Sequence, residues 1–425
     1  MTAVRDRSAR AGPLRLLAFR DFRLLWIGET TSSFGSSISN VALPLVALTV
    51  LHAGVFAISV LTAAAWLPWL IVGLPAGAWV DRLPRRRVMM TADLVSLAVF
   101  ASVPVAAAVG WLTITQLIVV ALLAGTATVF FATAYRAFLP ALLGGDDLLE
   151  GNAKLQGSEQ VTHVAGPGAA GLIAQATSAV GGVIVDAASF AVSAVCLSRI
   201  RLDEPRPAAS RRHLRREIAE GLAVVAGDPL LRMNAVYGCL SDLVLTGYQA
   251  VLVFYLVGVV GLSPGLAGIV LALTSLGGVL GALVARRVAA RVGTARAVLF
   301  CKVGLAPFGL LIPLADRGPG LAQFLLGNIV VIDGIVAGNV IWSGWVQAYY
   351  PADLLGRIST SVQVLNYGAI PAGAVIAGLV AGQLGVRPTL WIMLTGLVLS
   401  SCVLLLGPLP KLRDLPHRAP ATTSK

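Results

Sequence analysis

Long apolar runs separated by short polar and charged segments make up most of this chain. Residues 94–135, 243–285 and 358–386 contain no Asp, Glu, Lys or Arg. A helix that spans a membrane needs about 20 mostly apolar residues, so the first two runs each have room for two such helices. Divided at glycine, proline and charge, the runs predict twelve spanning helices, at about residues 22–50, 56–80, 88–109, 113–136, 152–176, 180–198, 230–257, 265–286, 295–314, 321–348, 358–383 and 388–407.

The positions of the basic residues support this number of helices. An even number of spans places both termini on one side of the membrane, and of the 32 Lys and Arg residues only Arg317 and Arg387 fall on the other side. Because each missed helix would invert every later loop, such an asymmetry favours the predicted topology. The side that carries the basic residues, with both termini, is therefore predicted to be cytoplasmic.

The composition excludes an ordinary water-soluble protein, because 57% of the residues are hydrophobic, 12% are charged and the mean hydropathy is +0.85. The net charge of +12 comes from residues that flank the apolar runs, so it indicates a lipid bilayer and not a nucleic acid as the partner. The four cysteines lack the spacing of metal ligands, and no GxxxxGK-S/T nucleotide-binding pattern is present. We therefore predict no metal and no cofactor.

Internal repeats indicate a duplicated membrane protein. Gly77–Arg82 is similar to Gly281–Arg286, 204 residues later, and Asp147–Leu149 recurs as Asp353–Leu355, 206 residues later. The linker between the halves is rich in charge, and its residues 211–226 either form an amphipathic helix at the lipid headgroups or remain a solvated connection. The predicted organisation is an N-terminal tail (1–21), a six-helix bundle (22–198), a cytoplasmic linker (199–228), a second six-helix bundle (229–407) and a C-terminal tail (408–425).

Residues 77–87, Gly-Ala-Trp-Val-Asp-Arg-Leu-Pro-Arg-Arg-Arg, resemble motif A of the major facilitator superfamily, in the loop between helices two and three where that family carries it. Trp79 and Pro84 depart from the motif. Residues 19–28 and 354–358 are similar to the drug-exporter branch that includes macrolide and enterobactin exporters. The resemblance implies an all-α membrane protein with two pseudo-symmetric six-helix bundles, which acts as a monomer in the bacterial inner membrane and is not an enzyme.

Motif A makes physical sense as a latch on the outward-facing state. An aspartate at the cytoplasmic end of helix two can accept hydrogen bonds from arginine side chains and from a helix N-terminus of the other half. Asp81 and Arg82 are the candidates for this role. The alternative is that the cluster only orients the chain in the membrane. The other residues assigned to this gate are Gly77, Arg85, Arg86 and Asp93.

Ionisable residues inside spanning segments are costly to bury and are candidates for function. Glu29 is the only formal charge between Leu24 and Val80, and apolar surroundings favour its protonated form, so that it can exchange a proton or recognise a cation. Asp242 and Asp333 are the candidates in the second half. Asp186 is interpreted as a packing or gating acid. Glu159 and His163 stand four residues apart on one helix face, which suits either a proton relay or a polar packing pair.

Small residues and proline in the fifth predicted helix indicate a packing surface or hinge. Gly166-Pro167-Gly168-Ala169-Ala170-Gly171 resembles the core of the antiporter motif, and Pro371 is the related feature of the second half. Simple helix packing explains the same pattern. Aromatic and amide side chains that are candidates for an amphipathic cargo cavity are Trp66, Trp69, Tyr248, Asn339, Trp342, Asn366 and Tyr367.

These observations predict a secondary active transporter that exports an amphipathic small molecule, such as a drug, an antibiotic or a siderophore-like metabolite, in exchange for protons. Proton-coupled uptake of a metabolite is the alternative within the transporters. A membrane sensor that does not transport is the alternative of a different class. A membrane-embedded enzyme would need paired acids or a metal cluster at one face, and the four histidines are scattered.

Overall fold

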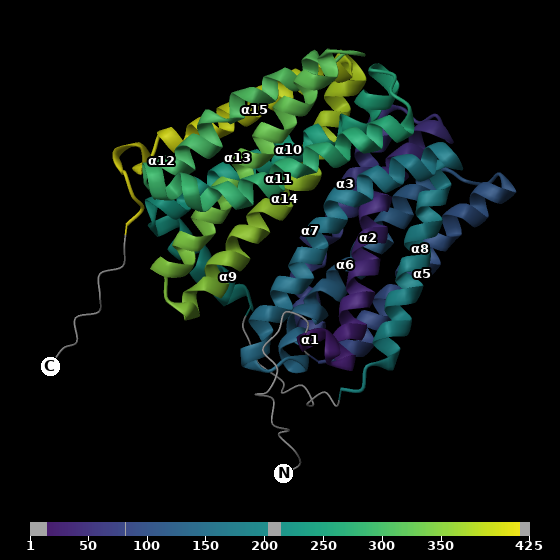
Figure 1. Cartoon of the computed structure of the whole chain (residues 1–425), viewed down its shortest axis with the longest axis horizontal. Coiled ribbons are helices and arrows are strands. Elements are labelled where there is room, and N and C mark those ends of the chain that lie inside the picture. Colours follow the sequence, from purple (N-terminus) through teal and green to yellow (C-terminus); the bar gives the residue numbers. More distant parts are fainter. Residues whose placement is uncertain (1–14, 81, 203–213, 417–425) are drawn as a thin grey trace, which may run out of the picture.

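The computed structural model describes residues 15–80, 82–202 and 214–416, whose secondary structure is entirely helical. Two groups of helices, α2–α8 and α10–α15, approach each other at one end and diverge toward the end where α1 and α9 lie (Figure 1). The elements are α1 (Arg15–Ala18), α2 (Arg20–Thr49), α3 (Val55–Ile71), α4 (Gly73–Val80), α5 (Arg85–Val109), α6 (Ile114–Leu142), α7 (Gly145–Ala176), α8 (Ala179–Arg199), α9 (Leu214–Gly227), α10 (Pro229–Phe254), η1 (Tyr255–Val259), α11 (Pro264–Val292), α12 (Thr294–Leu299), η2 (Phe300–Gly304), η3 (Ala306–Leu314), α13 (Gly320–Tyr349), α14 (Ala352–Leu384), α15 (Val386–Cys402), η4 (Val403–Leu405) and η5 (Leu409–Lys411).

The predicted spanning helices correspond to observed ones. In the described part of the chain, nine helices are long and apolar enough to cross a membrane. The other three predicted spans correspond to α2, to α3 with α4, and to α7, which carry more polar residues or are interrupted. The prediction of an all-α membrane fold is therefore confirmed, and the described helices are consistent with the twelve predicted spans.

Two predicted spans are not single regular helices. Residues 56–80 form α3 and α4 with a turn at Val72, because Pro75 has no N–H to donate to the carbonyl of Ile71. The ninth span begins as α12, continues as the π-helix η2 and ends as the 3-10 helix η3. Pro307 removes a backbone N–H donor there in the same way. The neighbouring backbone groups form the hydrogen bonds of a π-helix and a 3-10 helix in place of those of an α-helix.

Within each group the helices bury their apolar faces against neighbours. In the first group α2 packs on α7 and α8, and α5 packs on α6 and α8; in the second, α10 packs on α14 and α15, and α11 packs on α13. The two groups contact each other where α7 crosses α11 and where α3 crosses α14. These crossings pair a helix of one half with a helix of the other, as the duplicated sequence predicts.

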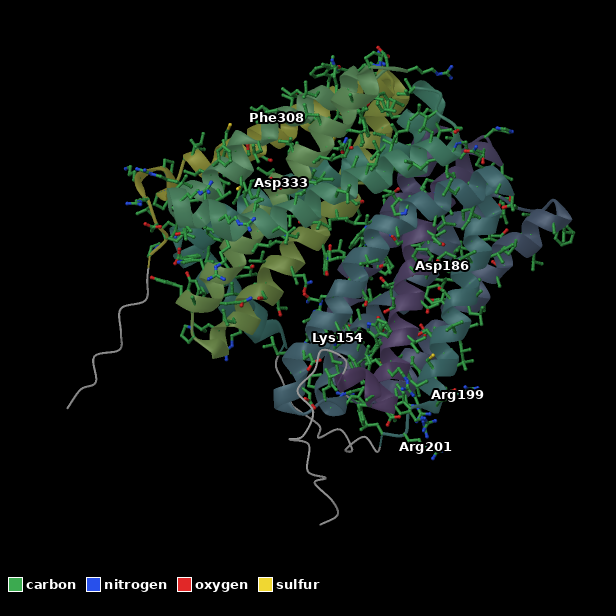
Figure 2. All side chains as sticks on the ribbon, viewed as in Figure 1. Lys154, Asp186, Arg199, Arg201, Phe308 and Asp333 are labelled. Carbon is green, nitrogen blue, oxygen red and sulfur yellow. The ribbon has the colours of Figure 1, made fainter. Side chains whose placement is uncertain are left out.

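The charged linker contains a helix that packs on the second group. α9 lies against α14, and Arg357 Nη1 donates to Glu220 Oε2 at 2.7 Å. Val225 is almost fully buried. Over residues 214–227 the interpretation as a helix is confirmed, while residues 211–213 lie outside the described part of the chain. We call the end that carries α1, Lys154, Arg199 and Arg201 (Figure 2) the basic end, and the other the opposite end.

Candidate functional site

The two groups of helices meet closely where α7 crosses α11 near the opposite end. A Cβ atom built at Gly171 would lie 2.7 Å from Cα of Gly268, and one built at Gly268 would lie 2.7 Å from Cα of Gly171. Gly168 faces Ala272 in ordinary contact. Because carbon atoms normally stay about 3.5 Å apart or more, only glycine fits at the first two positions. The segment Gly166–Gly171 thus closes the opposite end, although its first glycine packs on Ser37 of α2.

The same face of α7 is open toward the basic end. Successive steps of three or four residues back along α7 from Gly168 lead to Val161 and then to Gly157. These residues therefore share the face of Gly168 and Gly171. Val161 is 66% exposed, and no atom lies within 4 Å of a Cβ atom built at Gly157. The groups of helices are therefore in contact at the opposite end and apart at the basic end, as their outline in Figure 1 also shows.

The crossing of α3 and α14 brings aromatic side chains of both groups together. The ring of Tyr367 lies 5.0 Å from that of Trp69 and 6.4 Å from that of Trp66. Gln363 donates a hydrogen bond to the Tyr367 hydroxyl at 2.7 Å, and Arg136 of α6 also interacts with that hydroxyl. Three of the residues predicted for a cargo cavity thus meet at the boundary between the groups, together with Arg136, which the sequence analysis did not single out.

Carboxylates gather inside the first group. Glu29 on α2 is within electrostatic range of Asp93 on α5 and of Glu159 on α7. Glu29 Oε1 and Asp93 Oδ2 are buried and have no hydrogen-bond partner among the described residues. Asp93 is 2% exposed and interacts with Ser193 of α8. The structure therefore places Asp93 with Glu29 in a buried acid cluster, two turns inside the helix that Arg85 and Arg86 begin.

The acid cluster reaches the open face of α7 through Glu159. His163 Nε2 lies 3.7 Å from Glu159 Oε1, and both side chains are about half exposed. Trp26 donates to Ser158 at 2.8 Å, and Ser33 and Thr162 are hydrogen-bonded at 2.9 Å, so that α2 and α7 are held together by polar contacts on either side of the cluster. This arrangement provides protonatable groups from the open face to a buried carboxyl.

The predicted gate is described only in part. Asp81 lies outside the described residues. Arg82 is exposed, and no atom lies within 4 Å of a Cβ atom built at Gly77. Arg86 Nη2 donates to the carbonyl of Ser198 at 2.8 Å, where it satisfies an end carbonyl of α8. At the equivalent glycine of the second half, Gly281, the backbone of α13 packs closely.

In the second group Asp242 has a partner that the sequence analysis did not single out. Lys302, on η2, is 3% exposed and interacts electrostatically with Asp242. Its Nζ donates to Asn234 at 3.2 Å and lies 4.6 Å from the ring centroid of Tyr237. A single lysine inside an apolar run near a basic loop gives no signal of burial in the sequence. Asp333 lies on α13 within electrostatic range of Cys301 and is not part of the pair of Asp242 and Lys302.

The remaining predicted cavity residues are not brought together. Tyr248 is buried within the second group and donates to Asn328 at 2.6 Å. The ring of Trp342 lies 4.9 Å from that of Trp345, tilted by 54°, in a core near the basic end, and Asn339 is exposed. Asn366 faces Gly238 of α10. Pro371 lies two residues before Gly373, where α14 packs against the backbone of Leu243.

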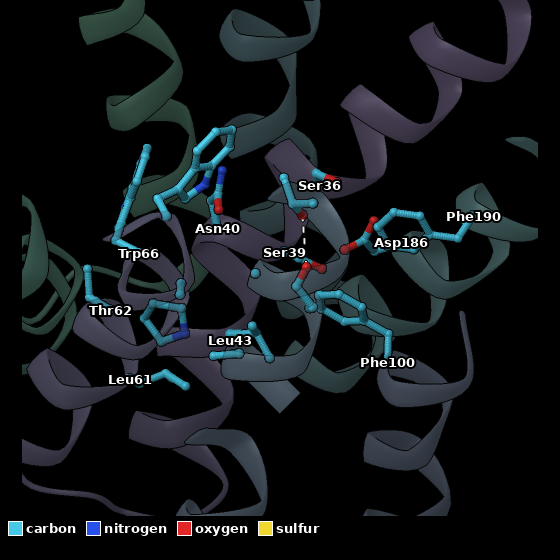
Figure 3. A pocket seen from close by; sticks show the side chains of 17 residues that line it. Ser36, Ser39, Asn40, Leu43, Leu61, Thr62, Trp66, Phe100, Asp186 and Phe190 are labelled. Carbon is cyan, nitrogen blue, oxygen red and sulfur yellow. Dashed lines mark hydrogen bonds between the residues drawn. The ribbon is translucent and has the colours of Figure 1, made fainter. Parts of the chain in front are cut away.

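A cavity of about 290 Å³ opens inside the first group, between α2, α3, α5, α6 and α8 (Figure 3). Trp66 and Trp69 line it from α3, and Asp186 lines it from α8. In the described residues no three His, Cys, Asp or Glu side chains are grouped to hold a metal ion.

A model of the family described as transmembrane secretion effectors matches residues 11–422. The chain belongs to this family of the major facilitator superfamily. Two relatives whose sequences align with most of this major facilitator chain are named as efflux proteins. The multidrug efflux pump Tap of Mycolicibacterium fortuitum is 31% identical over 96% of the chain and 98% of its own length. Macrolide efflux protein A of Streptococcus pyogenes is 20% identical over 91% of the chain and 95% of its own length.

Solved structures of other transporters share the fold of this superfamily member. The nucleoside transporter NupG superposes with a TM-score of 0.74 at 12% identity, over 92% of this chain and 99% of NupG. A bacterial homologue of the iron transporter ferroportin, in an inward-facing state, superposes with a TM-score of 0.73 at 15% identity, over 91% and 98% of the two chains. The resemblance to the major facilitator superfamily is thus confirmed, and the protein is a multi-pass membrane transporter.

Proposed function

We propose that this transporter exports an amphipathic small molecule and imports protons in exchange, by alternating access of the bundles at residues 22–198 and 229–407. The observation that carries the proposal is the acid cluster in which carboxyl oxygens of Glu29 and Asp93 are buried and Glu159 is half exposed on the open face. A buried carboxyl group with an oxygen that accepts no hydrogen bond favours binding of a proton or a cation. Full-length likeness to two efflux proteins supports the direction of transport.

The orientation that we propose follows from the basic end. Lysine and arginine are enriched on the cytoplasmic side of membrane proteins, so we assign the basic end and both termini to the cytoplasm of a bacterium, with the protein in the inner membrane as a monomer. The described conformation, joined through Gly171 and Gly268 at the opposite end, is then the inward-facing one. Protonated Glu29 would release its proton to the cytoplasm from this state, through Glu159 and His163.

We propose that cargo binds at the boundary between the bundles. The aromatic rings of Trp66, Trp69 and Tyr367 supply an apolar surface, and Gln363, which donates to the Tyr367 hydroxyl, supplies a polar group beside it. Such a surface recognises shape and apolar area, with a few polar groups to orient the molecule. It suits amphipathic molecules that enter from the cytoplasm or from the inner leaflet of the bilayer.

Growth inhibition and proton movement together test the proposed function. The chain is expressed in a bacterial host that lacks its own exporters, and a panel of amphipathic antibiotics and dyes is tested against the same host with an empty vector. Inverted membrane vesicles, whose lumen is acidified by respiration, then receive each compound that the chain protects against. We expect protection against at least one compound, and release of lumenal protons when it is added. Movement of the compound and protons across the membrane in the same direction would instead establish symport, as the uptake alternative requires, and protection without proton movement would exclude proton exchange.

Substitution of Asp81 by asparagine tests the gate. We expect Asp81→Asn to remain in the membrane in normal amount but to transport poorly, because charge-assisted hydrogen bonds of about 1.5–3 kcal/mol would be lost from the outward-facing state. Transport is measured as dye efflux from loaded cells, with surface amount measured by immunoblot. Asp21→Asn, which removes an acid from the first turn of α2, is the control. Normal efflux by Asp81→Asn would leave the arginine cluster as a topological signal only.

Glu159→Gln tests the proposed route of the proton. The substitution removes the carboxylate that lies 3.7 Å from His163. We therefore expect transport to be slower and to depend less on pH, because a positioned acid–base group speeds proton transfer. Initial rates of dye efflux are measured across a pH series. Glu150→Gln makes the same chemical change nearer the basic end of α7, where the carboxylate contacts Lys154 at 3.5 Å. An unchanged pH profile in Glu159→Gln would remove this pair from the route.

A further inference from the structure

We propose that the cavity inside the first bundle binds the cationic group of an organic cargo, with Asp186 as its counter-ion. The proposal rests on the proposed transport function, and it adds the class of cargo. The cavity has a volume of about 290 Å³ and lies between five helices. Asp186 lines the cavity although it has no exposed surface (0%). Its carboxyl group points from α8 toward Ser36 and Ser39 of α2, and Trp66 lies across the cavity (Figure 3).

The carboxyl group of Asp186 lacks a full set of partners. Oδ1 accepts from the Ser189 hydroxyl at 3.3 Å, and the Ser39 side chain of α2 also interacts with the carboxyl group, while Oδ2 is buried with no partner in hydrogen-bond geometry among the described residues. None of the 17 residues that line the cavity is Lys, Arg or His. A carboxyl group in such a place is stable when it carries a proton or when it faces a cation. The cavity therefore contains one carboxyl group that can pair with a cationic ligand, and no basic side chain of the lining competes for it.

The packing of α2 on α8 fixes the carboxyl group in place. A Cβ atom built at Gly35 would lie 2.6 Å from Asp186 Oδ1 and 2.7 Å from Ser189 Cβ. Glycine at this position lets the two helices approach, and the approach leaves Asp186 little freedom to turn away from the cavity. A preformed charge of this kind loses little entropy when a ligand binds.

The other walls suit an aromatic or alkylated cation. Trp66, Trp69, Phe100 and Phe190 line the cavity, and the faces of aromatic rings attract ammonium groups. A metal ion is a poor occupant, because Asp186 is the only carboxylate in the lining and hard cations require several oxygen ligands. The volume accommodates a charged ring system or the charged end of a larger molecule.

The cavity and the boundary between the bundles share one side chain. Trp69, which lines the cavity, also contacts Tyr367 of α14 with the ring centroids 5.0 Å apart. A molecule held on the aromatic surface at the boundary can therefore place its charged end toward Asp186. Cargo recognition would then divide into an apolar part at the boundary and a charged part inside the first bundle.

Binding to the purified full-length protein in detergent tests this inference without any transport. The ligands are N-methylacridinium, which carries a permanent positive charge, and acridine, which has nearly the same shape and is mostly neutral at neutral pH. Binding is followed by quenching of tryptophan fluorescence, and the double substitution Trp66→Phe with Trp69→Phe identifies the part of the signal that comes from the cavity. We expect the wild-type protein to bind N-methylacridinium at least about tenfold more tightly than acridine.

Asp186→Asn then assigns the preference to one side chain. We expect its Kd for N-methylacridinium to rise by about 10- to 100-fold, the range for loss of a hydrogen bond to a charged group, with little change for acridine. Asp316→Asn, which removes an exposed carboxylate paired with Arg387 at the opposite end, is the control and should bind both ligands as the wild type does.

Two results would overturn the inference. One is equal affinity of Asp186→Asn and wild type for N-methylacridinium, and the other is equal affinity of the wild type for both ligands. The second comparison needs no variant, so it decides the matter even when Asp186→Asn does not fold. Charge-selective binding in a protein that exports nothing would contradict the proposed function and leave the cation site standing.

Discussion

Glu29→Gln is expected to abolish export against a gradient while it leaves exchange of cargo across the membrane close to the wild-type rate. Glutamine fills nearly the same volume as glutamate but cannot take up or release a proton, so the buried acid cluster loses its central group. We expect proton-driven export to fall by about tenfold or more, which corresponds to at least about 1.4 kcal/mol. Export is measured in inverted vesicles, and exchange is measured as counterflow of labelled cargo in liposomes.

The comparison of the two assays makes the Glu29 prediction specific. A variant that is misfolded loses both activities, and Glu150→Gln controls for the loss of a carboxylate elsewhere. Export by Glu29→Gln at the wild-type rate would show that another acid, such as Asp242 beside Lys302, carries the proton. Loss of counterflow together with export would indicate that Glu29 binds the cargo and not the proton.

Gly171→Ala is expected to shift the protein out of the conformation described here. The added methyl group would meet the backbone of Gly268 and of Pro264 far inside normal contact. Overpacking of this kind costs about 1–3 kcal/mol, which changes the ratio of two conformations by about 5- to 150-fold. Because the clash exists only while α7 and α11 touch at the opposite end, we expect the basic end to close and the opposite end to open.

Cysteine labelling measures this shift. In a background without the four native cysteines, Val161→Cys reports on the open face of α7 near the basic end, and Gln175→Cys reports on the crossing near the opposite end. We expect Gly171→Ala to slow labelling at position 161 and to speed it at position 175. Gly157→Ala, on the same helix face with no atom within 4 Å of the new methyl group, should change neither rate. Unchanged labelling in Gly171→Ala would mean that the glycine contact does not hold the two bundles in this state.

The sequence predicted the spans well because the signals for them are local. Apolar length, proline, glycine and flanking charge determine where a helix can cross a bilayer. α11 extends past its predicted end at residue 286 because Arg287 and Arg291 continue the helix beyond the apolar core, whereas α6 extends past residue 136 through further apolar residues that follow Arg136. The irregular ninth span was not predicted, since the prolines that interrupt it lie within an unbroken apolar run.

The site was predicted less well because the contacts that build it are not local. A spanning helix is apolar on nearly every side, so its sequence does not show which side faces a neighbour, lipid or a cavity. Tyr248 and Trp342 were therefore candidates for a cavity and are packed in the interior of the second bundle. Gly171 was recognised as a packing residue, but its partner Gly268 and the grouping of Asp93 with Glu29 follow only from how the helices pack in space.

Movement of protons in exchange for cargo is the central claim, and one measurement tests it most directly. The purified protein is reconstituted in liposomes that contain a pH-sensitive dye and have an acidic lumen, and a compound against which the chain protects cells is added outside. We predict that the compound accumulates in the lumen while the lumenal pH rises, and that Glu29→Gln shows neither change. Accumulation of the compound with no change in lumenal pH, or with entry of protons alongside it, would contradict the account.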